Sequence, residues 1–291
     1  MTTRIAGLSA AGSDYRAILC DVWGVLHNGV SVYRDAETAL VNYRQNGGKV
    51  VLLTNSPRPN DGVMAQLDQI EVSRDAYDEI VTSGDVTRQL IADAEGPIFH
   101  LGPQRDLPLF EGQNAELSDE EVCQTIVCTG LFEDETEMPE DYRQRLESLA
   151  AREIPLICAN PDLVVERGDR LIYCAGSLAQ LYRELGGETR VAGKPHAPIY
   201  KLAMQKLAEL EGAEADKKNV LAIGDGMPTD VAGAIGNGFD LLYISAGIHS
   251  VEYGSPLDPD EARLEAFLRQ NNVDPTLWMP RLIWQAEAGN G

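Results

Sequence analysis

Positive charge is scarce in this chain: its 291 residues include 24 Lys plus Arg against 46 Asp plus Glu, a net charge of −22. Nucleic acids and anionic membrane surfaces both attract proteins through basic faces. The composition therefore argues against nucleic acid and membrane as general partners. It leaves room for a small anionic ligand, because local hydrogen-bond donors or a metal ion decide that case.

Long apolar runs are also missing. No segment approaches the roughly 18 apolar residues that cross a bilayer, and residues 1–14 contain no apolar run as long as a signal peptide needs. The five cysteines form no CxxC pair and mostly lie inside apolar runs, which is typical of reduced, buried thiols. We therefore expect a cytoplasmic protein.

Short apolar runs alternate with amphipathic segments at both ends of the chain. We predict strands at 16–23, 49–54, 79–82, 219–224 and 240–245, an edge strand at 281–284, and helices at 37–45, 59–70, 198–210 and 259–271. Strands that alternate with helices are typical of a parallel, doubly wound sheet. The pattern indicates an α/β fold with a Rossmann-like core.

The middle of the chain breaks this alternation at Gly96-Pro97 and then shows a pattern of its own. Residues 163–166 and 170–173 flank Arg167-Gly168-Asp169, which is a hairpin signal. We predict a second α/β domain at residues 85–188, inserted into a core domain formed by residues 1–84 and 189–291.

Acidic residues close two of the apolar runs. Asp21 follows Ala17-Ile18-Leu19-Cys20, and Gly224-Asp225-Gly226-Met227-Pro228-Thr229-Asp230 follows another run. Carboxyl ends of parallel strands meet at one crevice, where open α/β sheets bind ligands. Three acids there repel one another unless a cation lies between them, so the pattern predicts a hard divalent metal and an anionic ligand.

Asp21 is the candidate nucleophile, because a carboxylate can attack phosphorus and form an aspartyl phosphate. Asp225 and Asp230 are suited to hold Mg²⁺, although either alone is more often a turn or helix-start acid. Thr54-Asn55 follows a predicted strand and could bind phosphate oxygens or simply cap a helix. Lys194 could neutralise the phosphate, although a lone Lys before a helix is usually a surface residue.

Four segments together resemble the motifs of the haloacid dehalogenase superfamily: DVWGVLHNG, LLTNS, GKP and GDGMPTD, in this order along residues 21–230. The insertion resembles the α/β cap of the subgroup that includes pyridoxal phosphatase, nitrophenylphosphatase and a sugar phosphatase. The resemblance implies a Mg²⁺-dependent phosphomonoesterase, a hydrolase that acts on a small phosphorylated metabolite through an aspartyl phosphate. Caps of this kind often mediate dimers, which leaves a homodimer open.

The resemblance also implies roles for individual residues. Asp21 would be the nucleophile, Thr54 and Asn55 would bind phosphate, and Lys194 would brace the transition state. The metal would be held by Asp21, the backbone carbonyl of Trp23, Asp225 and Asp230. Asn160 and Asp162 lie in the loop that faces the substrate in relatives, and a plain turn role is as good an interpretation.

Trp23 departs from the family pattern, in which a second Asp protonates the leaving group. An indole cannot exchange a proton near neutral pH, so hydrolysis is expected to be slow or limited to good leaving groups. His27 could supply a proton instead, although a structural role is more common for such a residue. Two alternatives stay open: a protein that binds a phosphorylated metabolite without turnover, and a non-phosphate hydrolase of the haloacid dehalogenase type.

Overall fold

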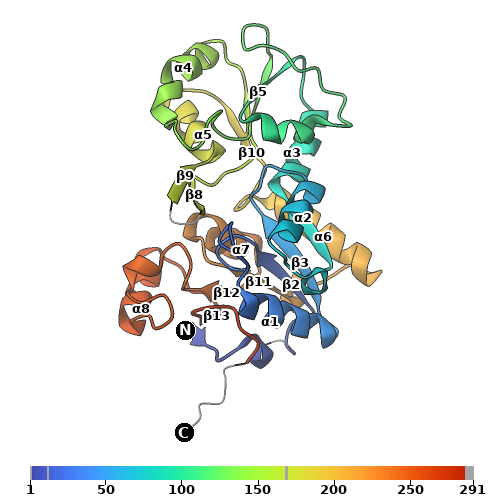
Figure 1. Cartoon of the computed structure of the whole chain (residues 1–291), viewed down its shortest axis with the longest axis vertical. Coiled ribbons are helices and arrows are strands. Elements are labelled where there is room, and N and C mark those ends of the chain that lie inside the picture. The colour runs from blue at the N-terminus through green and yellow to red at the C-terminus, as the bar shows by residue number, and fades with distance from the viewer. Residues whose placement is uncertain (1, 12, 168–169, 286–291) are drawn as a thin grey trace. The chain divides into compact units, whose positions relative to one another are not determined.

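The computed structural model describes residues 2–11, 13–167 and 170–285. Its chain divides into two compact units (Figure 1). The first unit contains Met1–Thr54, Gln66–Val81 and Tyr200–Gly291, and the second contains Asn55–Ala65 and Thr82–Ile199. Along the described part of the chain, none of the helices is long and apolar enough to cross a membrane.

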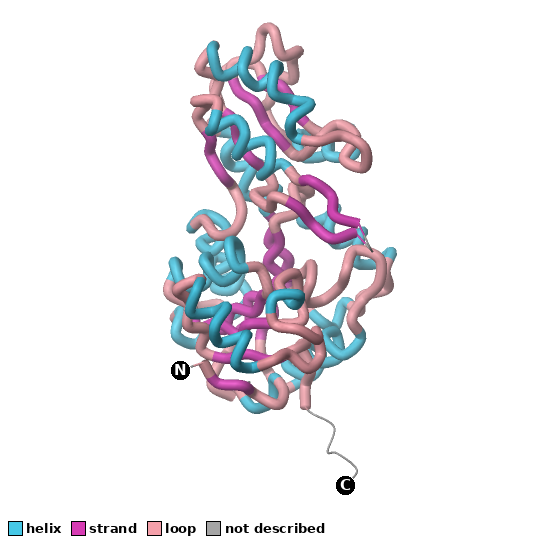
Figure 2. The backbone as a smooth tube through the Cα atoms, turned by 90° about the vertical axis from the view of Figure 1, so that its left-hand side faces the viewer, coloured by secondary structure: helices cyan, strands magenta, loops and turns pink. Residues whose placement is uncertain are grey.

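A seven-stranded sheet forms the centre of the first unit. Its strands, in spatial order, are β1 (Thr3–Arg4), β13 (Leu277–Met279), β12 (Asp240–Ile244), β11 (Val220–Gly224), β2 (Ala17–Asp21), β3 (Lys49–Thr54) and β4 (Glu79–Thr82). Successive pairs from β1 to β3 are parallel. Figure 2 shows strands in the middle of this unit and helices around them, and both residues of the edge strand β1 are exposed. The predicted Rossmann-like α/β fold is confirmed.

The chain order of this sheet reverses between two neighbouring strands. From β2 the chain moves outward to β3 and β4, whereas from β11 it moves in the opposite direction to β12 and β13. Every residue of β2 and of β11 is buried, as expected for strands that are covered on both faces of a parallel sheet. The carboxyl ends of β2 and β11 therefore flank the point where such sheets bind ligands.

Helices occupy the connections between the strands, in both units. They are α1 (Arg34–Gln45), α2 (Asn60–Gln69), α3 (Ser83–Ala92), α4 (Arg143–Ala151), α5 (Ala175–Glu184), α6 (Ala197–Glu211), α7 (Ala232–Asn237) and α8 (Glu261–Gln270). Helix α3 starts at a capping box: the Thr82 side chain accepts a bond from Asp85 N, and the Asp85 side chain accepts one from Thr82 N.

A four-stranded parallel sheet forms the centre of the second unit. Its spatial order is β10 (Thr189–Val191), β7 (Leu156–Cys158), β6 (Thr125–Cys128) and β5 (Ile98–Leu101). Alternate residues of β6 enter different clusters: Ile126 and Cys128 pack with α4 and α5, and Val127 packs with Ile91 of α3. Period-two alternation thus buries both faces of this sheet. The predicted hairpin is present as β8 (Val164–Arg167) and β9 (Arg170–Tyr173), which are antiparallel.

The prediction of an edge strand at 281–284 is wrong. The strand at this end of the chain is β13, which pairs with β12 on one side and with β1 on the other. Pro280 follows β13 directly, and proline ends a ladder because it has no N–H to donate. Residues 283 and 284 instead accept single bonds from Leu8 N and Ser9 N.

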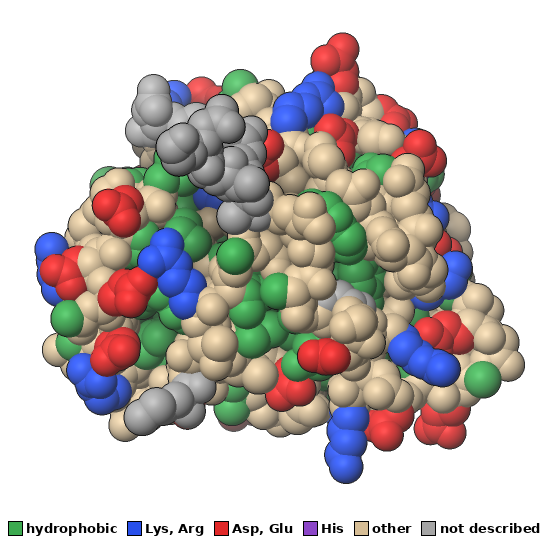
Figure 3. Space-filling model, turned by 90° about the horizontal axis from the view of Figure 1, so that it is seen from below, with side chains coloured by type: hydrophobic (Ala, Val, Ile, Leu, Met, Phe, Trp, Pro, Cys, Tyr) green, Lys and Arg blue, Asp and Glu red, His purple; other side chains and the backbone are tan. Residues whose placement is uncertain are grey.

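The surface carries charges of both signs. On the face drawn in Figure 3, hydrophobic side chains lie towards the middle, and acidic and basic side chains alternate around them. The basic side chains in this view stand apart from one another among acidic ones, as expected from the net charge of −22.

Candidate active site

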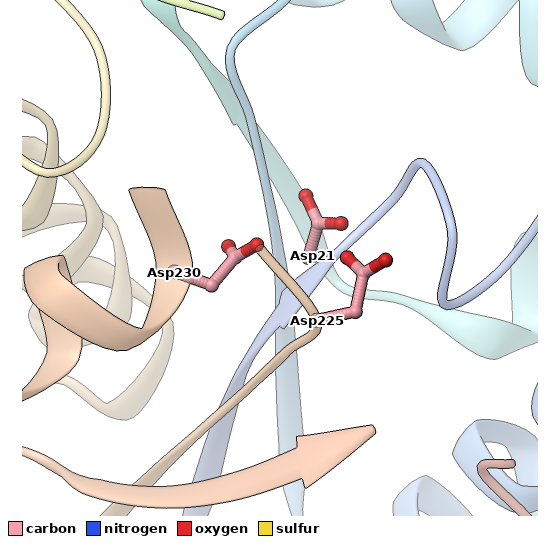
Figure 4. A group of neighbouring side chains, drawn as sticks. All are labelled: Asp21, Asp225 and Asp230. Atoms are coloured by element: carbon pink, nitrogen blue, oxygen red, sulfur yellow. The ribbon is translucent and has the colours of Figure 1, made fainter. Parts of the chain in front are cut away.

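Three aspartates converge at the carboxyl ends of β2 and β11. Asp21 is the last residue of β2, Asp225 follows β11 directly, and Asp230 lies in the helical turn Met227–Val231. Parallel pairing of Cys20 with Ile223 brings the two strand ends together. One carboxylate oxygen of each residue lies within 4.8 Å of the others, and Figure 4 shows the three side chains reaching the same small space.

These three carboxylates are almost completely buried, with exposures of 6% for Asp21, 5% for Asp225 and 7% for Asp230. Buried like charges at this distance repel strongly unless a cation lies between them. Carboxylate oxygens are the donors that Mg²⁺ prefers, and Mg²⁺ usually needs only one to three of them besides water and substrate oxygens. The donor set therefore fits a small, hard divalent cation.

A π-helical turn places Asp230. Val231 N donates to Gly226 O over 3.0 Å, a five-residue step, and α7 begins only at Ala232. Such turns occur frequently at functional sites, because they redirect a side chain without ending the helix. Gly226 N donates to Asp230 Oδ2 over 3.1 Å, which fixes one oxygen of this carboxylate.

Asp225 is held by residues that the sequence did not indicate. Ile248 N donates to its Oδ2 over 2.9 Å. A β-carbon on Gly24 would lie 2.5 Å from the same oxygen, and the φ of Gly24 is +88°, a conformation that favours glycine. Gly24, the first of the two glycines in the DVWGVLHNG segment, therefore leaves room for the carboxylate of Asp225.

Trp23 and His27 form one packed loop that directly follows Asp21 in the chain. Their rings meet edge to face, with centroids 5.1 Å apart, and His27 Nδ1 accepts a bond from Gly29 N over 2.8 Å. His27 is 1% exposed, and burial lowers its pKa to about 4. The imidazole is therefore neutral at neutral pH. These contacts favour a structural role for His27 over the role of a proton donor.

Thr54 ends β3, the strand next to β2, and it is 7% exposed. Asp21 pairs with Leu53, so Thr54 lies one residue beyond the residue that pairs with Asp21. Thr54 is therefore at the same end of the sheet as Asp21.

The other predicted residues lie in the second unit. Asn55 Oδ1 accepts a bond from Lys194 N over 2.7 Å, and Asn55 Nδ2 donates to Asp162 Oδ1 over 2.9 Å. Asn160 Oδ1 accepts a bond from Asp162 N over 3.1 Å. The structure thus gathers Asn55, Asn160, Asp162 and Lys194 from three distant segments into one network, which the sequence alone did not predict.

Lys194 and Asn55 are each only 3% exposed, so the lysine is not a surface residue. Gly193 allows this packing, because a β-carbon there would lie 2.3 Å from Asn55 Oδ1 and 2.8 Å from Pro161. The backbone of Gly193 and Lys194 therefore packs directly against the Asn55 side chain and donates a hydrogen bond to it.

Comparisons with known proteins agree with this geometry. Residues 18–116 match a family model described as haloacid dehalogenase-like hydrolase, and residues 191–263 match one described as HAD-hydrolase-like. The chain is 46% identical to a solved hydrolase of the haloacid dehalogenase-like family from Brucella suis 1330, over 97% of this chain and 100% of that one, with a TM-score of 0.86.

Two more distant relatives have names that indicate a substrate class. An acid sugar phosphatase of Staphylococcus saprophyticus is 25% identical over 82% of this chain and 90% of its own length. A possible sugar phosphatase from Cytophaga hutchinsonii is 19% identical over 95% of this chain and 97% of that one, with a TM-score of 0.78, and this likeness shows the shared fold.

Proposed function

The chain belongs to the haloacid dehalogenase-like hydrolases, and from this membership we propose that it is a Mg²⁺-dependent phosphomonoesterase acting on a small phosphorylated metabolite such as a sugar phosphate. The observation that carries the proposal is the convergence of Asp21, Asp225 and Asp230 within 4.8 Å at the ends of β2 and β11. The acid sugar phosphatase among its relatives supports the choice of substrate class.

In the proposed reaction, an oxygen of Asp21 attacks phosphorus, and the bond between phosphorus and the leaving oxygen breaks. Trp23 cannot supply the proton that this oxygen needs, so water supplies it. A second water then attacks the phosphorus of the aspartyl phosphate, which releases phosphate, regenerates the Asp21 carboxylate and gives its proton to solvent. Bound Mg²⁺ would offset the negative charge of the carboxylates and of the phosphoryl group.

The remaining roles follow from the family resemblance and are part of the proposal. Thr54 and Asn55 would bind phosphate oxygens, and Lys194 would offset their charge. The Trp23 carbonyl would complete the metal ligands, and Asn160 and Asp162 would belong to the substrate loop. The bond from Lys194 N to Asn55 Oδ1 supports a common task for these two residues.

The same proposal covers the organisation of the protein. We propose a core domain of residues 1–84 and 189–291 with a cap at 85–188, a cytoplasmic location and, where the cap mediates association, a homodimer. Gel filtration with light scattering measures the last of these.

Phosphate release from a panel of phosphorylated metabolites, with Mg²⁺ and with EDTA, tests the function. Wild type should release phosphate only with Mg²⁺, and Asp21→Asn should release none while its circular dichroism spectrum stays unchanged. Phosphate release in EDTA equal to that with Mg²⁺ would contradict the proposed role of the metal ion.

Trp23 favours one runner-up, a protein that binds a phosphorylated metabolite without turning it over. Calorimetry together with the phosphate assay separates the two functions. A binding protein would bind a panel compound in the presence of Mg²⁺ and release no phosphate from it over hours. Measurable turnover that Asp21→Asn abolishes would exclude this alternative.

A further inference from the structure

Residues 245–249, which follow β12, form a segment that lies against the acidic loop Asp225–Asp230. Ile248 N donates to Asp225 Oδ2, and a β-carbon on Gly247 would lie 1.8 Å from that same oxygen. The backbone of this segment therefore touches the side of the Asp225 carboxylate. One oxygen of Asp225 is fixed by this contact, which sets the direction of the other.

A second contact joins the same segment to the acidic loop through a side chain. His249 Nε2 accepts a bond from Met227 N over 3.1 Å. Met227 begins the helical turn that carries Asp230, and N–H groups at the start of a helical turn lack partners within it. Burial lowers the pKa of His249, so the ring stays neutral and Nε2 keeps its lone pair.

The segment is also anchored at the end of β13 and by Tyr253. Ser245 N and Ala246 N donate to Met279 O and Pro280 O, over 3.0 and 2.8 Å. The hydroxyl of Tyr253, a residue with 0% exposure, donates to Ser245 O over 2.7 Å.

Helix α8 supports the imidazole of His249. The ring packs on Phe267 with centroids 5.5 Å apart, and Phe267 also packs on Tyr253. The packing of the His249 ring on Phe267 therefore fixes the position of its acceptor atom, Nε2.

We propose that His249 is a positioning residue for the metal site: through Met227 N it fixes the loop that carries Asp225 and Asp230, while Gly247 and Ile248 fix the Asp225 carboxylate. The inference rests on the proposed function, since it requires these aspartates to bind a divalent cation. Partners that orient metal ligands typically contribute 10–100-fold to metal affinity when removed one at a time.

Mn²⁺ binding by the full chain tests the role without reference to activity, because the electron paramagnetic resonance signal of unbound Mn²⁺ reports affinity directly. His249→Phe keeps a ring against Phe267 and removes the acceptor, whereas His249→Gln keeps an acceptor at a similar reach and removes the ring. We expect the Phe variant to bind Mn²⁺ about 10-fold more weakly and the Gln variant to stay within about 3-fold of wild type.

A glycine pair provides an independent measurement, which also applies if the phenyl ring does not fit. Gly247→Ala places a methyl group on Asp225 Oδ2, and we expect it to weaken Mn²⁺ binding by about 10-fold or more. Gly236→Ala is the matched control, since a β-carbon there meets nothing within 4 Å. Thermal unfolding of each variant shows that it is folded.

Wild-type affinity in His249→Phe, or an equal loss in the Phe and Gln variants, would overturn the role of the acceptor. Equal affinity in Gly247→Ala and Gly236→Ala would overturn the role of the segment. If the wild-type chain binds no Mn²⁺, the proposed metal site fails, and this inference fails with it.

Discussion

The indole ring of Trp23 occupies the space that a side chain at residue 29 would need: a β-carbon on Gly29 would lie 2.3 Å from Cζ2 of Trp23. His27 completes the arrangement, since its ring packs on Trp23 and its Nδ1 accepts the Gly29 N–H. The DVWGVLHNG segment is therefore built around the indole. Trp23 therefore has a packing role in this loop, in addition to standing where the family pattern has an acid.

Gly29→Ala should destabilise the protein by about 3 kcal/mol, because the methyl group meets the indole and the φ of +85° is strained for alanine. Gly47→Ala is the matched control, with a φ of +92° and nothing within 4 Å of its β-carbon, and should cost only about 1 kcal/mol. Urea unfolding measures both. Equal losses would show that the indole does not fill this space.

Trp23→Asp should shift the reaction towards poor leaving groups. We expect the ratio of kcat/KM for an alkyl phosphate to that for p-nitrophenyl phosphate to rise at least about 10-fold, since a positioned general acid typically contributes 10²–10⁴-fold. Thermal stability should fall, because the packing on His27 is lost. Trp23→Asn is the control, because Asn has the shape of Asp and cannot donate a proton as an acid. An equal rise of the ratio in Trp23→Asn would contradict general acid catalysis by the introduced Asp.

The pKa of His27 predicts a loss of stability in mild acid. Burial lowers this pKa to about 4 from its ordinary value of 6.5, so protonation favours the unfolded chain. The free energy of unfolding therefore has its full value above pH 6.5 and decreases as the pH falls towards 4. At pH 5 the loss is about 2 kcal/mol. His27→Asn keeps an acceptor for Gly29 N and does not titrate.

Urea unfolding of wild type and His27→Asn at pH 7.5 and pH 5 measures this effect. The difference in unfolding free energy between the two proteins should change by about 2 kcal/mol between these pH values. Parallel pH profiles would show that His27 titrates normally.

Removing one carboxylate should stabilise the protein without metal and prevent its stabilisation by metal. Asp230→Asn relieves repulsion among three buried acids, and its side-chain oxygen can still accept the bond from Gly226 N. In EDTA we expect its midpoint of thermal unfolding to exceed that of wild type. With millimolar Mg²⁺ the order should reverse, because a bound ligand stabilises only the protein that binds it. A midpoint of thermal unfolding of wild type that does not change with Mg²⁺ would contradict the proposed metal site.

The sequence was sufficient for the strands β2, β3, β4, β11 and β12 and for the acids at the edge of their sheet, and it gave no signal for the two-residue strand β1. Strands such as Val220–Gly224 are continuous apolar runs, and an acid at the end of such a run has a defined place once strand order is known. The proximity of Asp21 and Asp225 could therefore be predicted from the sequence. The last strand was misplaced because both Leu277–Met279 and Leu282–Trp284 are short apolar runs, and only pairing with β12 and β1 selects the first.

The contacts that hold the site could not be predicted in the same way. Ile248 acts through its backbone N–H, which every residue except proline has, and Gly247 acts through the absence of a side chain. Neither leaves a compositional signal near Asp225 in the chain. The network of Asn55 with Asp162 and Lys194 likewise joins segments more than 100 residues apart, which a single sequence does not pair.

In the proposed reaction, Asp21 attacks phosphorus beside a divalent cation. Because Trp23 cannot act as a base, the aspartyl phosphate should break down slowly and accumulate with a good leaving group. Wild type is mixed with p-nitrophenyl phosphate and Mg²⁺, quenched in acid and analysed by peptide mass spectrometry. We expect one added phosphoryl group on the peptide that contains Asp21, present with Mg²⁺ and absent with EDTA. Phosphate release without that adduct, or an adduct on another residue, would contradict the proposed reaction.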